Sequence, residues 1–166
     1  MIRAGRALAL TALLCLAAAQ GCTTPVDGGA APVAENGIGE LRDGAVQAAE
    51  QAAVALTSLD HRDPEAGYDR LLELLTDPAR QEWAQRRAEF LTPITSSGAV
   101  TSAAVVRSSG VAALDPAAAT ATVLVAAAAT VSSQQRATPE QRRYRLQMSL
   151  IRTPAGWKVS QLQVLQ

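Results

Sequence analysis

The sequence has few of the residues on which disulfide, metal and redox chemistry depend. Its 166 residues include two cysteines, one histidine and only 3% aromatic residues. The cysteines are Cys15 and Cys22, so the chain beyond residue 22 has no disulfide and no cysteine metal site. His61 stands alone, and no group of histidines or carboxylates has metal-ligand spacing. We therefore expect a domain that is held together by packing alone, with no metal and no cofactor.

The chain also lacks net charge, because its basic and acidic residues number 15 each. This balance argues against a nucleic-acid partner. The charges are nonetheless unevenly distributed, since residues 27–89 hold 13 acidic and 6 basic side chains, whereas residues 90–166 hold 2 acidic and 7 basic ones. An acidic first layer and a mildly basic second layer are predicted. The difference either reflects two solvated faces or marks a polar partner surface.

What the sequence does have is the pattern of a secretory leader. Arg3 and Arg6 precede an uncharged run over residues 7–19, and a small-residue cut site stops directly before Cys22. A cysteine at that position is typical of lipoproteins, because its thiol accepts a diacylglyceryl group. We expect residues 1–21 to be a lipoprotein signal peptide, which places the protein on the extracytoplasmic face of the cell membrane through a lipid anchor at Cys22. The alternatives are plain secretion and an uncleaved anchor, although the apolar run is shorter than the roughly 20 residues that a spanning helix needs.

A tether and a single domain are predicted after the leader. Residues 22–39 are rich in Gly, Pro, Ala and Thr and lack any hydrophobic period, which is typical of a flexible linker. Residues 40–166 are long enough for one domain. Its first helix is predicted over residues 40–59, where apolar residues recur at three- and four-residue steps. The predicted stripe consists of Leu41, Ala45, Ala48, Ala52, Leu56 and Leu59.

Two Asp-Pro pairs predict further helix starts. In each pair the Asp is a good N-cap and the Pro suits the first turn. Asp63 is expected to begin a second helix whose buried face contains Tyr68, Leu71, Leu72 and Leu75. A third helix is predicted over residues 78–91, with Trp83 and Phe90 on one side and Pro93 as its terminator.

Beyond Pro93 the pattern changes to strands. Strands are predicted over residues 99–114, 120–131, 142–152 and 157–165, with turns between them and a polar loop over residues 133–141. In the third strand Tyr144 and Leu146 face one way, while Arg143 and Arg145 face the other. Helices followed by strands that are joined by short connections predict an α+β fold, in which N-terminal helices pack on a four-stranded antiparallel sheet.

Three stretches of the domain resemble the Mce-associated proteins, small bacterial proteins linked to Mce lipid-uptake systems. The similarity covers about residues 42–166. Its most specific pieces are the Arg62-Asp63 turn, the segment Ala113-Leu114-Asp115-Pro116, and the strand Arg143-Tyr144-Arg145 with Gly156-Trp157-Lys158-Val159-Ser160 after it. Members of that family usually carry a transmembrane helix where this chain has its leader and Cys22.

The resemblance implies a nuclear-transport-factor-like (SnoaL-like, cystatin-like) cone, in which helices cover a curved antiparallel sheet. It also implies a non-catalytic accessory subunit that docks on Mce-type transporter components at the outer face of the membrane. The alternative is a lipoprotein whose cone holds a lipid or another apolar ligand. Cavity volume discriminates between them, because the small residues Ala121, Ala127 and Ala129 either let the helices pack tightly or leave a void.

No convincing catalytic constellation is present, and we expect no enzyme activity. Ser58, His61 and Asp63 are spaced as turn residues rather than as an oriented triad. Tyr68 and Asp69 are adjacent on a helix and point about 100° apart, so they cannot both face one cavity. Tyr144 is a better inward donor, but Asp115 at a turn is a poor partner for it.

Two groups of residues remain as candidate binding positions. Arg143 and Arg145 share the outward face of their strand and are candidates for contact with acidic partner residues or lipid headgroups. Tyr144, Leu146 and Trp157 are candidates for the lining of a cone cavity, although a core role is the simpler expectation for Trp157.

Overall fold

The computed structural model describes residues 35–58 and 60–165. The predicted signal peptide, the proposed lipidation site Cys22 and most of the predicted tether therefore lie outside the described residues. Within them the elements follow the order α1 (Glu35–Thr57), α2 (Pro64–Leu74), α3 (Ala79–Gln85), α4 (Arg87–Ser97), β1 (Val100–Asp115), β2 (Thr120–Ser133), β3 (Arg136–Thr153) and β4 (Gly156–Leu165).

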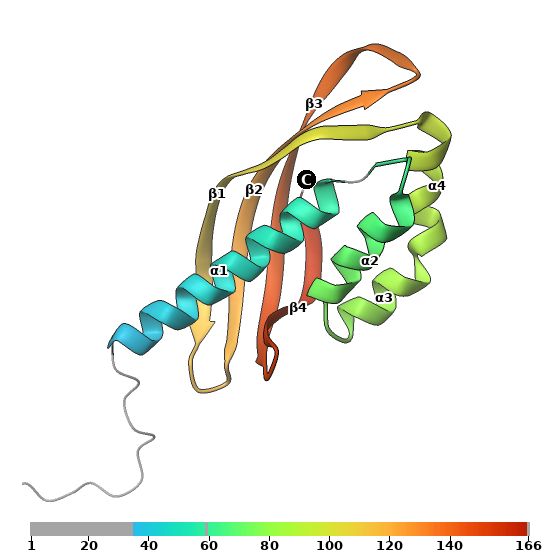
Figure 1. Ribbon diagram of the computed structural model, residues 1–166. Coiled ribbons are helices and arrows are strands. Elements are labelled where there is room, and N and C mark those ends of the chain that lie inside the picture. The colour runs from blue at the N-terminus through green and yellow to red at the C-terminus, as the bar shows by residue number, and fades with distance from the viewer. Residues whose placement is uncertain (1–34, 59, 166) are drawn as a thin grey trace, which may run out of the picture. The chain divides into compact units, whose positions relative to one another are not determined.

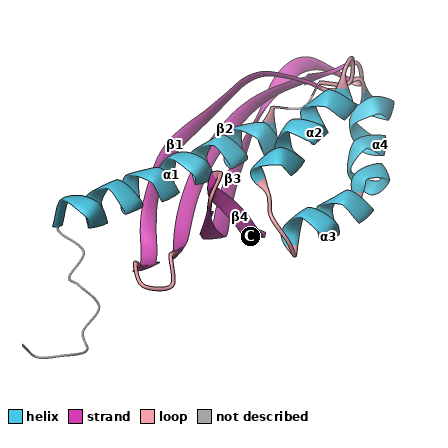
Figure 2. Ribbon diagram, turned by 60° about the horizontal axis from the view of Figure 1, so that its bottom comes forward, coloured by secondary structure: helices cyan, strands magenta, loops and turns pink. Residues whose placement is uncertain are grey.

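The strands form one antiparallel sheet in the order β1-β2-β3-β4, so each strand pairs with its neighbour in sequence. The helices lie on one face of this sheet, with α1 running obliquely across it and α2, α3 and α4 grouped beside α1 (Figure 1). Figure 2 shows the same two layers from another side. The predicted α+β class, with N-terminal helices packed on a four-stranded antiparallel sheet, is confirmed.

Helix α1 begins earlier than the sequence predicted. The composition placed residues 35–39 in the tether, yet the helix includes them. Half-buried Ile38 lies three residues before the buried Leu41 and continues the apolar stripe by one turn. Packing of that stripe outweighs the low helix propensity of the two glycines in the segment. Leu59, the predicted end of the helix, lies outside the described residues.

The face of α1 that meets the sheet is built mostly of alanine. Its buried residues are Leu41, Ala45, Ala49, Ala52, Ala53, Leu56 and Thr57. Beneath the helix layer, the inward positions of β2 are equally small and no more than 4% exposed: Ala121, Val123, Val125, Ala127 and Ala129. Of the two outcomes left open for the small residues of β2, the structure shows close packing.

Helix α2 begins as the Asp-Pro pair predicted. The Asp63 side chain accepts a hydrogen bond from the backbone N–H of Ala66 at 3.4 Å, and Pro64 occupies the first turn. The predicted buried face is confirmed for Tyr68, Leu71, Leu72 and Leu75, although Leu75 lies just beyond the end of the helix.

The single third helix predicted over residues 78–91 is wrong, because the chain forms two helices there. A break at Arg86 separates α3 from α4, and α4 continues through Pro93 to Ser97. Threonine hydroxyls on either side of the proline donate to nearby carbonyls, and buried Leu91 holds this turn against the core. The helix ends instead at Gly98, whose φ of 59° is left-handed.

The polar loop predicted over residues 133–141 is also wrong for most of its length. The turn occupies only residues 134–135, and β3 already begins at Arg136. Glu140 pairs with Val131 and Gln141 with Thr130, so the hairpin arm extends past the helices (Figure 1). Polar residues on both faces concealed this strand, since neither face of the arm is fully buried and alternation is lost.

The alternation predicted for the inner part of the sheet is confirmed. Leu146, Met148 and Leu150 of β3 are at most 1% exposed and face the helices, as does Val159 of β4. Tyr144 belongs to the same row but is only half-buried, because it lies where the hairpin arm leaves the helix layer.

Candidate functional site

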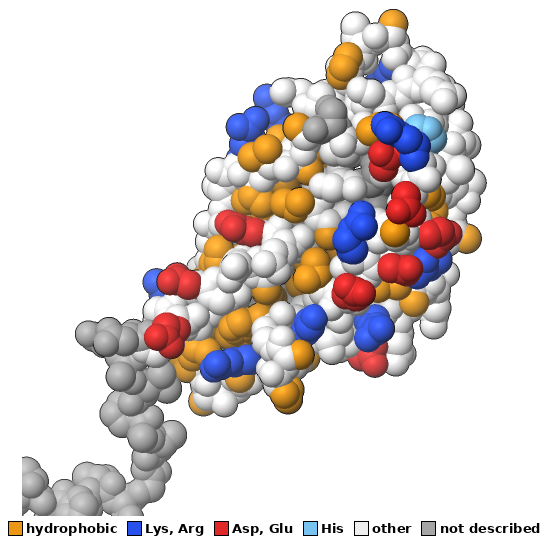
Figure 3. All heavy atoms as spheres, viewed as in Figure 1, with side chains coloured by type: hydrophobic (Ala, Val, Ile, Leu, Met, Phe, Trp, Pro, Cys, Tyr) orange, Lys and Arg blue, Asp and Glu red, His pale blue; other side chains and the backbone are white. Residues whose placement is uncertain are grey.

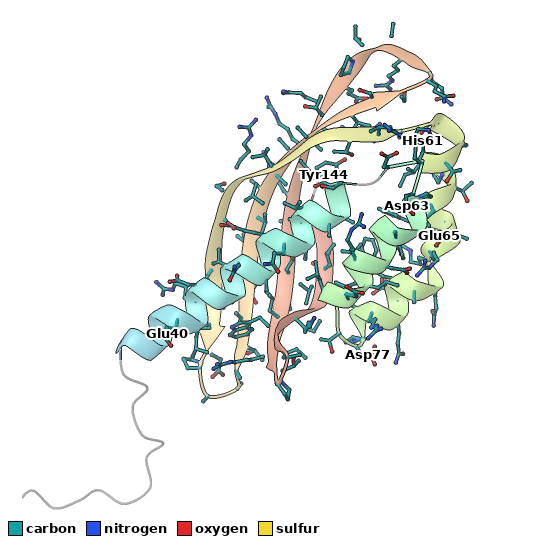
Figure 4. All side chains as sticks on the ribbon, viewed as in Figure 1. Glu40, His61, Asp63, Glu65, Asp77 and Tyr144 are labelled. Atoms are coloured by element: carbon teal, nitrogen blue, oxygen red, sulfur yellow. The ribbon has the colours of Figure 1, made fainter. Side chains whose placement is uncertain are left out.

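The polar residues around the start of α2 serve the backbone rather than chemistry. His61 donates its backbone N–H to the carbonyl of Ala99 at 2.9 Å, and its Nδ1 lies 3.3 Å from the same oxygen. Asp63 caps α2, and Asp60 accepts from the backbone N–H of Arg62 at 2.9 Å. Tyr144 lies on the sheet, away from His61 and Asp63 (Figure 4). His61 and Asp63 therefore act here as a turn residue and a helix cap.

Tyr68 and Asp69 diverge as their helical spacing predicted. The Tyr68 side chain is buried, and its hydroxyl donates to the carbonyl of Trp83 at 2.5 Å. Asp69 is exposed and forms an ion pair with Arg87, which also pairs with Glu65. Burial raises the pKa of Tyr68 above its ordinary value of 10.0, and the Arg87 guanidinium over its ring partly offsets that effect.

Three aromatic rings join α2, α3 and α4. The ring centroids of Trp83 and Phe90 lie 5.5 Å apart in an edge-on arrangement, and that of Tyr68 lies 5.6 Å from that of Phe90. The Arg87 guanidinium carbon lies 5.1 Å from the centroid of the Tyr68 ring. The break at Arg86 therefore separates two helices that share one aromatic cluster.

Metal chemistry has no visible basis in residues 35–58 and 60–165, where no group of three or more His, Cys, Asp or Glu side chains is placed to hold an ion. In the same residues, no helix is both long enough and apolar enough to cross a membrane.

An apolar cleft opens between α3 and α4 on one side and the sheet on the other. It has a volume of about 360 Å³, within the range of small-molecule pockets. Side chains from both layers line it, and we call it the aromatic cleft: Leu56, Thr57, Trp83, Glu89, Phe90, Pro93, Ile94, Ala99, Thr101, Val131, Arg142, Tyr144 and Val164. A neighbouring hollow of about 380 Å³ shares Trp83, Glu89, Phe90 and Val164 with it.

The predicted cavity residues occupy three different environments. Tyr144 lines the aromatic cleft. Leu146 is 1% exposed and belongs to the core. Trp157 is half-buried and packs against α1, where a Cβ on Gly44 would come within 3.0 Å of the indole. The structure thus brings only Tyr144 to a cleft, together with Trp83, Phe90 and Val164.

The opposite face of the sheet is basic and partly apolar. Arg143 pairs with Ala128 and Arg145 with Ala126 across β2 and β3, on the face away from the helices. We call this surface the basic sheet face, and it comprises Val105, Leu124, Ala126, Ala128, Arg143, Arg145 and Leu165. Leu124 is 43% exposed and Val105 46% exposed. Because the alanines beside the two arginines are small, another molecule can come close to the backbone of the sheet there.

Arg143 and Arg145 are free for an outside contact as far as the described residues show. The ion pairs of residues 35–58 and 60–165 include neither side chain. Arg142 differs, because it faces the helix layer and lines the aromatic cleft. Its guanidinium Nη2 also forms an ion pair with Glu140 Oε2 at 3.6 Å. Figure 3 views the other side of the molecule, where carboxylates gather over α2 and its neighbours.

A third surface was not predicted from the sequence. An open groove of about 860 Å³ lies between α1, α2 and β1, with exposed Val54 and Val105 among its lining residues. Most of its other side chains are polar, and Glu50 accepts a hydrogen bond from the Ser109 hydroxyl at 2.5 Å. Nothing in the sequence indicated it, because its walls combine two consecutive helices with β1, which lies farther along the chain.

One protein family matches most of the chain. Its description is "Uncharacterized protein Rv1363c/MT1408-like", and the match covers residues 38–165. The comparison with curated proteins finds no relative.

Solved structures share the fold at low sequence identity. An IcmL-like type IV secretion system protein from Legionella pneumophila has a TM-score of 0.61 at 12% identity, over 72% of this chain and 88% of that one. CagV, a VirB8 homolog from Helicobacter pylori, has a TM-score of 0.58 at 11% identity, over 75% and 99%. The periplasmic domain of DotI has a TM-score of 0.57 at 19% identity, over 72% and 91%. The expected fold of helices on one face of an antiparallel sheet is therefore also the fold of these solved structures.

Proposed function

The chain belongs to the Rv1363c/MT1408-like family of uncharacterized proteins, and from that premise we propose that it is a non-catalytic, membrane-anchored accessory subunit of an Mce-type lipid transport system. It acts by docking on transporter components at the outer face of the membrane. The resemblance of residues 42–166 to Mce-associated proteins is the reason for proposing an Mce-type transport system. The solved structures with this cone include components of secretion systems, so docking within an assembly is a role that suits the fold.

The basic sheet face is the observation that carries the docking role. It presents exposed Leu124 next to small Ala126 and leaves Arg143 and Arg145 without an ion-pair partner in the described part of the chain. Exposed apolar side chains beside unpaired cations form a surface on which an acidic partner gains both burial and charge pairing. The described polar residues near the start of α2 serve as caps and turn bonds, which favours docking over catalysis.

The proposal includes the membrane anchor. Residues 1–21 act as a lipoprotein signal peptide, Cys22 carries the lipid, and residues beyond it join the anchor to the folded domain. This organisation places the domain outside the cell membrane, within reach of an envelope transporter. Neither a cofactor nor nucleic acid takes part in the proposed role.

Co-purification from membranes tests this function. The intact protein is recovered from membranes in mild detergent, and the proteins that accompany it are identified by mass spectrometry. Mce-type components are expected with the natural chain. Arg143→Glu with Arg145→Glu should reduce their recovery, and added salt should weaken it further, because exposed charge contacts are screened.

A matched control separates docking from charge alone. Arg80→Glu changes an exposed arginine on α3, far from the basic sheet face, and should leave recovery unchanged. Equal losses in both variants, or no Mce-type component in any sample, would contradict the proposal. Loss of lipid uptake in a His61→Ala strain at normal protein abundance would instead reopen the possibility of an enzyme.

A second function rests on the aromatic cleft. Its volume of about 360 Å³ and its mostly apolar lining suit part of a lipid chain. If the cone holds such a ligand, mass spectrometry of extracts from the purified protein should find a bound lipid. Val164→Lys places a charge at the cleft and should remove it, whereas Val54→Lys, on the exposed side of α1, should not. Extracts free of lipid would leave docking as the single function.

A further inference from the structure

Strand β3 is longer than the partner strand on its outer side. β4 ends at Leu165, which pairs with Arg145. β3 begins at Arg136, so its first residues extend beyond that last pair and form the upper rim of the sheet in Figure 1. On this side no described strand pairs with the segment between Arg136 and Tyr144, which we call the free edge. Strand edges of this kind offer backbone groups to another chain.

The direction of the backbone groups along the free edge follows from one hydrogen bond. The Ser160 hydroxyl of β4 donates to the carbonyl of Ser149 at 3.1 Å, so the Ser149 carbonyl points toward β4. Backbone groups alternate between the two neighbours of a strand. The pairing of β3 with β2 runs without a shift from Glu140 to Ile151. The backbone groups of Arg143 and Gln141, which lie an even number of residues from Ser149, therefore point in the same direction as those of Ser149. Their N–H and C=O groups therefore face the free edge.

The side chains around the free edge form two distinct surfaces. On the inner side Tyr144, Arg142 and Val164 line the aromatic cleft. On the outer side lie the two unpaired arginines, Arg143 and Arg145. Glu140, the one acidic residue of the arm, already pairs with Arg136 and Arg142. The open edge is therefore basic outside, while its inner side combines apolar Tyr144 and Val164 with Arg142, whose charge Glu140 pairs.

We propose that an extended, acidic segment of a partner protein adds to the sheet as a strand along the free edge at Gln141 and Arg143. Its backbone pairs antiparallel to β3 and continues the line of β4. Its outward side chains are acidic and lie beside Arg143 and Arg145, while its inward side chains are apolar and enter the aromatic cleft. This proposal rests on the docking function above and deepens it by naming the form of the partner.

A second copy of the chain is a poor occupant of the same edge. Antiparallel pairing of two such edges would bring the arginines of both copies together, and like charges on neighbouring strands destabilise a sheet. An acidic strand would instead place carboxylates beside these arginines, and opposite charges on neighbouring strands stabilise a sheet. The charge of the edge therefore selects a foreign segment over self-association.

Peptide binding to the full chain in detergent tests the proposal. The probe is a short synthetic peptide that alternates Glu with Val, and the control alternates Lys with Val. We expect saturable binding of the Glu peptide, and no binding of a version N-methylated at the edge-facing amides, because methylation removes the donors that pair with β3. Equal binding of the methylated peptide would show that charge alone holds it and would overturn strand addition.

Amide hydrogen exchange supplies a second readout. On peptide binding the amides of Gln141 and Arg143 should become protected, whereas those of Arg142 and Tyr144, which already point toward β2, should not change. Edge amides that are protected before peptide is added, or that gain no protection from it, would overturn the proposal.

Charge variants locate the strand. Arg143→Glu should weaken binding of the Glu peptide about tenfold and should let the Lys peptide bind instead. Arg107→Glu, at an exposed arginine of β1, is the matched control and should bind as the natural chain does. Peptide-induced dimers, or loss of binding in the Arg107 variant, would overturn the assignment to the free edge.

The two proposals fail separately. If the peptide does not bind while Arg143 and Arg145 still govern co-purification, docking through the basic sheet face stands and strand addition is wrong. If the peptide binds with the alternating protection and no Mce-type component co-purifies, strand addition is supported and the assignment of the transport system is wrong.

Discussion

At the scale of single residues, Tyr68 of α2 contacts both α3 and α4 and so joins the three short helices. Its buried ring meets Phe90, its hydroxyl bonds the carbonyl of Trp83, and Arg87 lies over its face. The ring is fully buried, so ionisation inside the fold is costly. Tyr68 is therefore both a packing residue and a source of pH dependence.

Tyr68→Phe should lower the free energy of unfolding by about 0.5–1.5 kcal/mol at neutral pH, since one hydrogen bond is lost. Burial raises the pKa of Tyr68 above 10.0 in the folded chain, so above that pH the unfolded chain loses a proton that the folded chain keeps. Stability of the natural protein should thus fall as pH rises past this point. The difference in free energy of unfolding between the natural protein and the Tyr68→Phe variant, measured by urea titration, should therefore become smaller above that pH. A constant difference would show that Tyr68 does not titrate with unfolding.

Gly98 permits a second test at this scale. Its φ of 59° is left-handed, and a Cβ there would come 2.8 Å from the Gln134 side chain. Gly98→Ala should cost about 1–2 kcal/mol, mostly from backbone strain. The control is Gly110→Ala, where no atom lies within 4 Å of the added Cβ. Denaturant unfolding should separate the two variants, and equal midpoints would place the helix end elsewhere.

Single residues were predictable where local chemistry decides their role. Asp63 caps α2 because its side chain reaches a nearby backbone N–H, as its position before a proline predicted. The same spacing predicted a cap at Asp77, and that prediction is wrong, because α3 begins after Pro78 without a side-chain cap. Pro93 was not predictable in the same way. The cost of a proline inside a helix is local, but the buried Leu91 that offsets it belongs to the tertiary structure.

At the scale of elements, α1 depends on the absence of large side chains at its interface. Ala52 and Ala49 are fully buried against the rest of the core. Ala52→Leu should overpack this seam and cost about 1–3 kcal/mol. Gln51→Leu adds a similar side chain on the exposed side of the same helix and should change stability little. Thermal unfolding of both variants measures the difference, and two equal losses would show that overpacking at the buried seam is not responsible, since Gln and Leu have similar helix propensity.

Elements with one buried face were predictable, and those without one were not. Strand β2 and the second half of β3 show the predicted alternation because one face of each meets the helices. The arm of β3 from Arg136 to Gln141 has no such face, so its polar residues predicted a loop. Its strand conformation comes from pairing with β2.

At the scale of the whole molecule, the aromatic cleft shows why the candidate site was only partly predictable. Trp83 and Phe90 come from the helices, while Tyr144 and Val164 come from β3 and β4. Sequence alternation placed Tyr144 on the inward face. It did not show that the helices stop short of it, because that depends on where α4 lies over the sheet.

The anchor belongs to this scale as well. Cys22→Ala should release the protein from membranes or leave it unprocessed, because stable attachment needs two or more acyl chains. Partition into detergent and the intact mass of the purified protein check this. A mature chain that retains residues 1–21 and carries no lipid would show that the lipoprotein assignment is wrong.

The separation of charge between the two layers has a consequence for the folded unit in solution. The acidic residues before Phe90 lie mainly in the helices, and the basic residues beyond it lie mainly in the sheet. The unit therefore has a permanent electric dipole moment directed from one layer to the other. In the electric field of an acidic surface the folded unit orients its sheet toward that surface before contact, so a larger fraction of encounters has the correct orientation. This torque acts over about 8 Å at physiological salt and vanishes as salt is added.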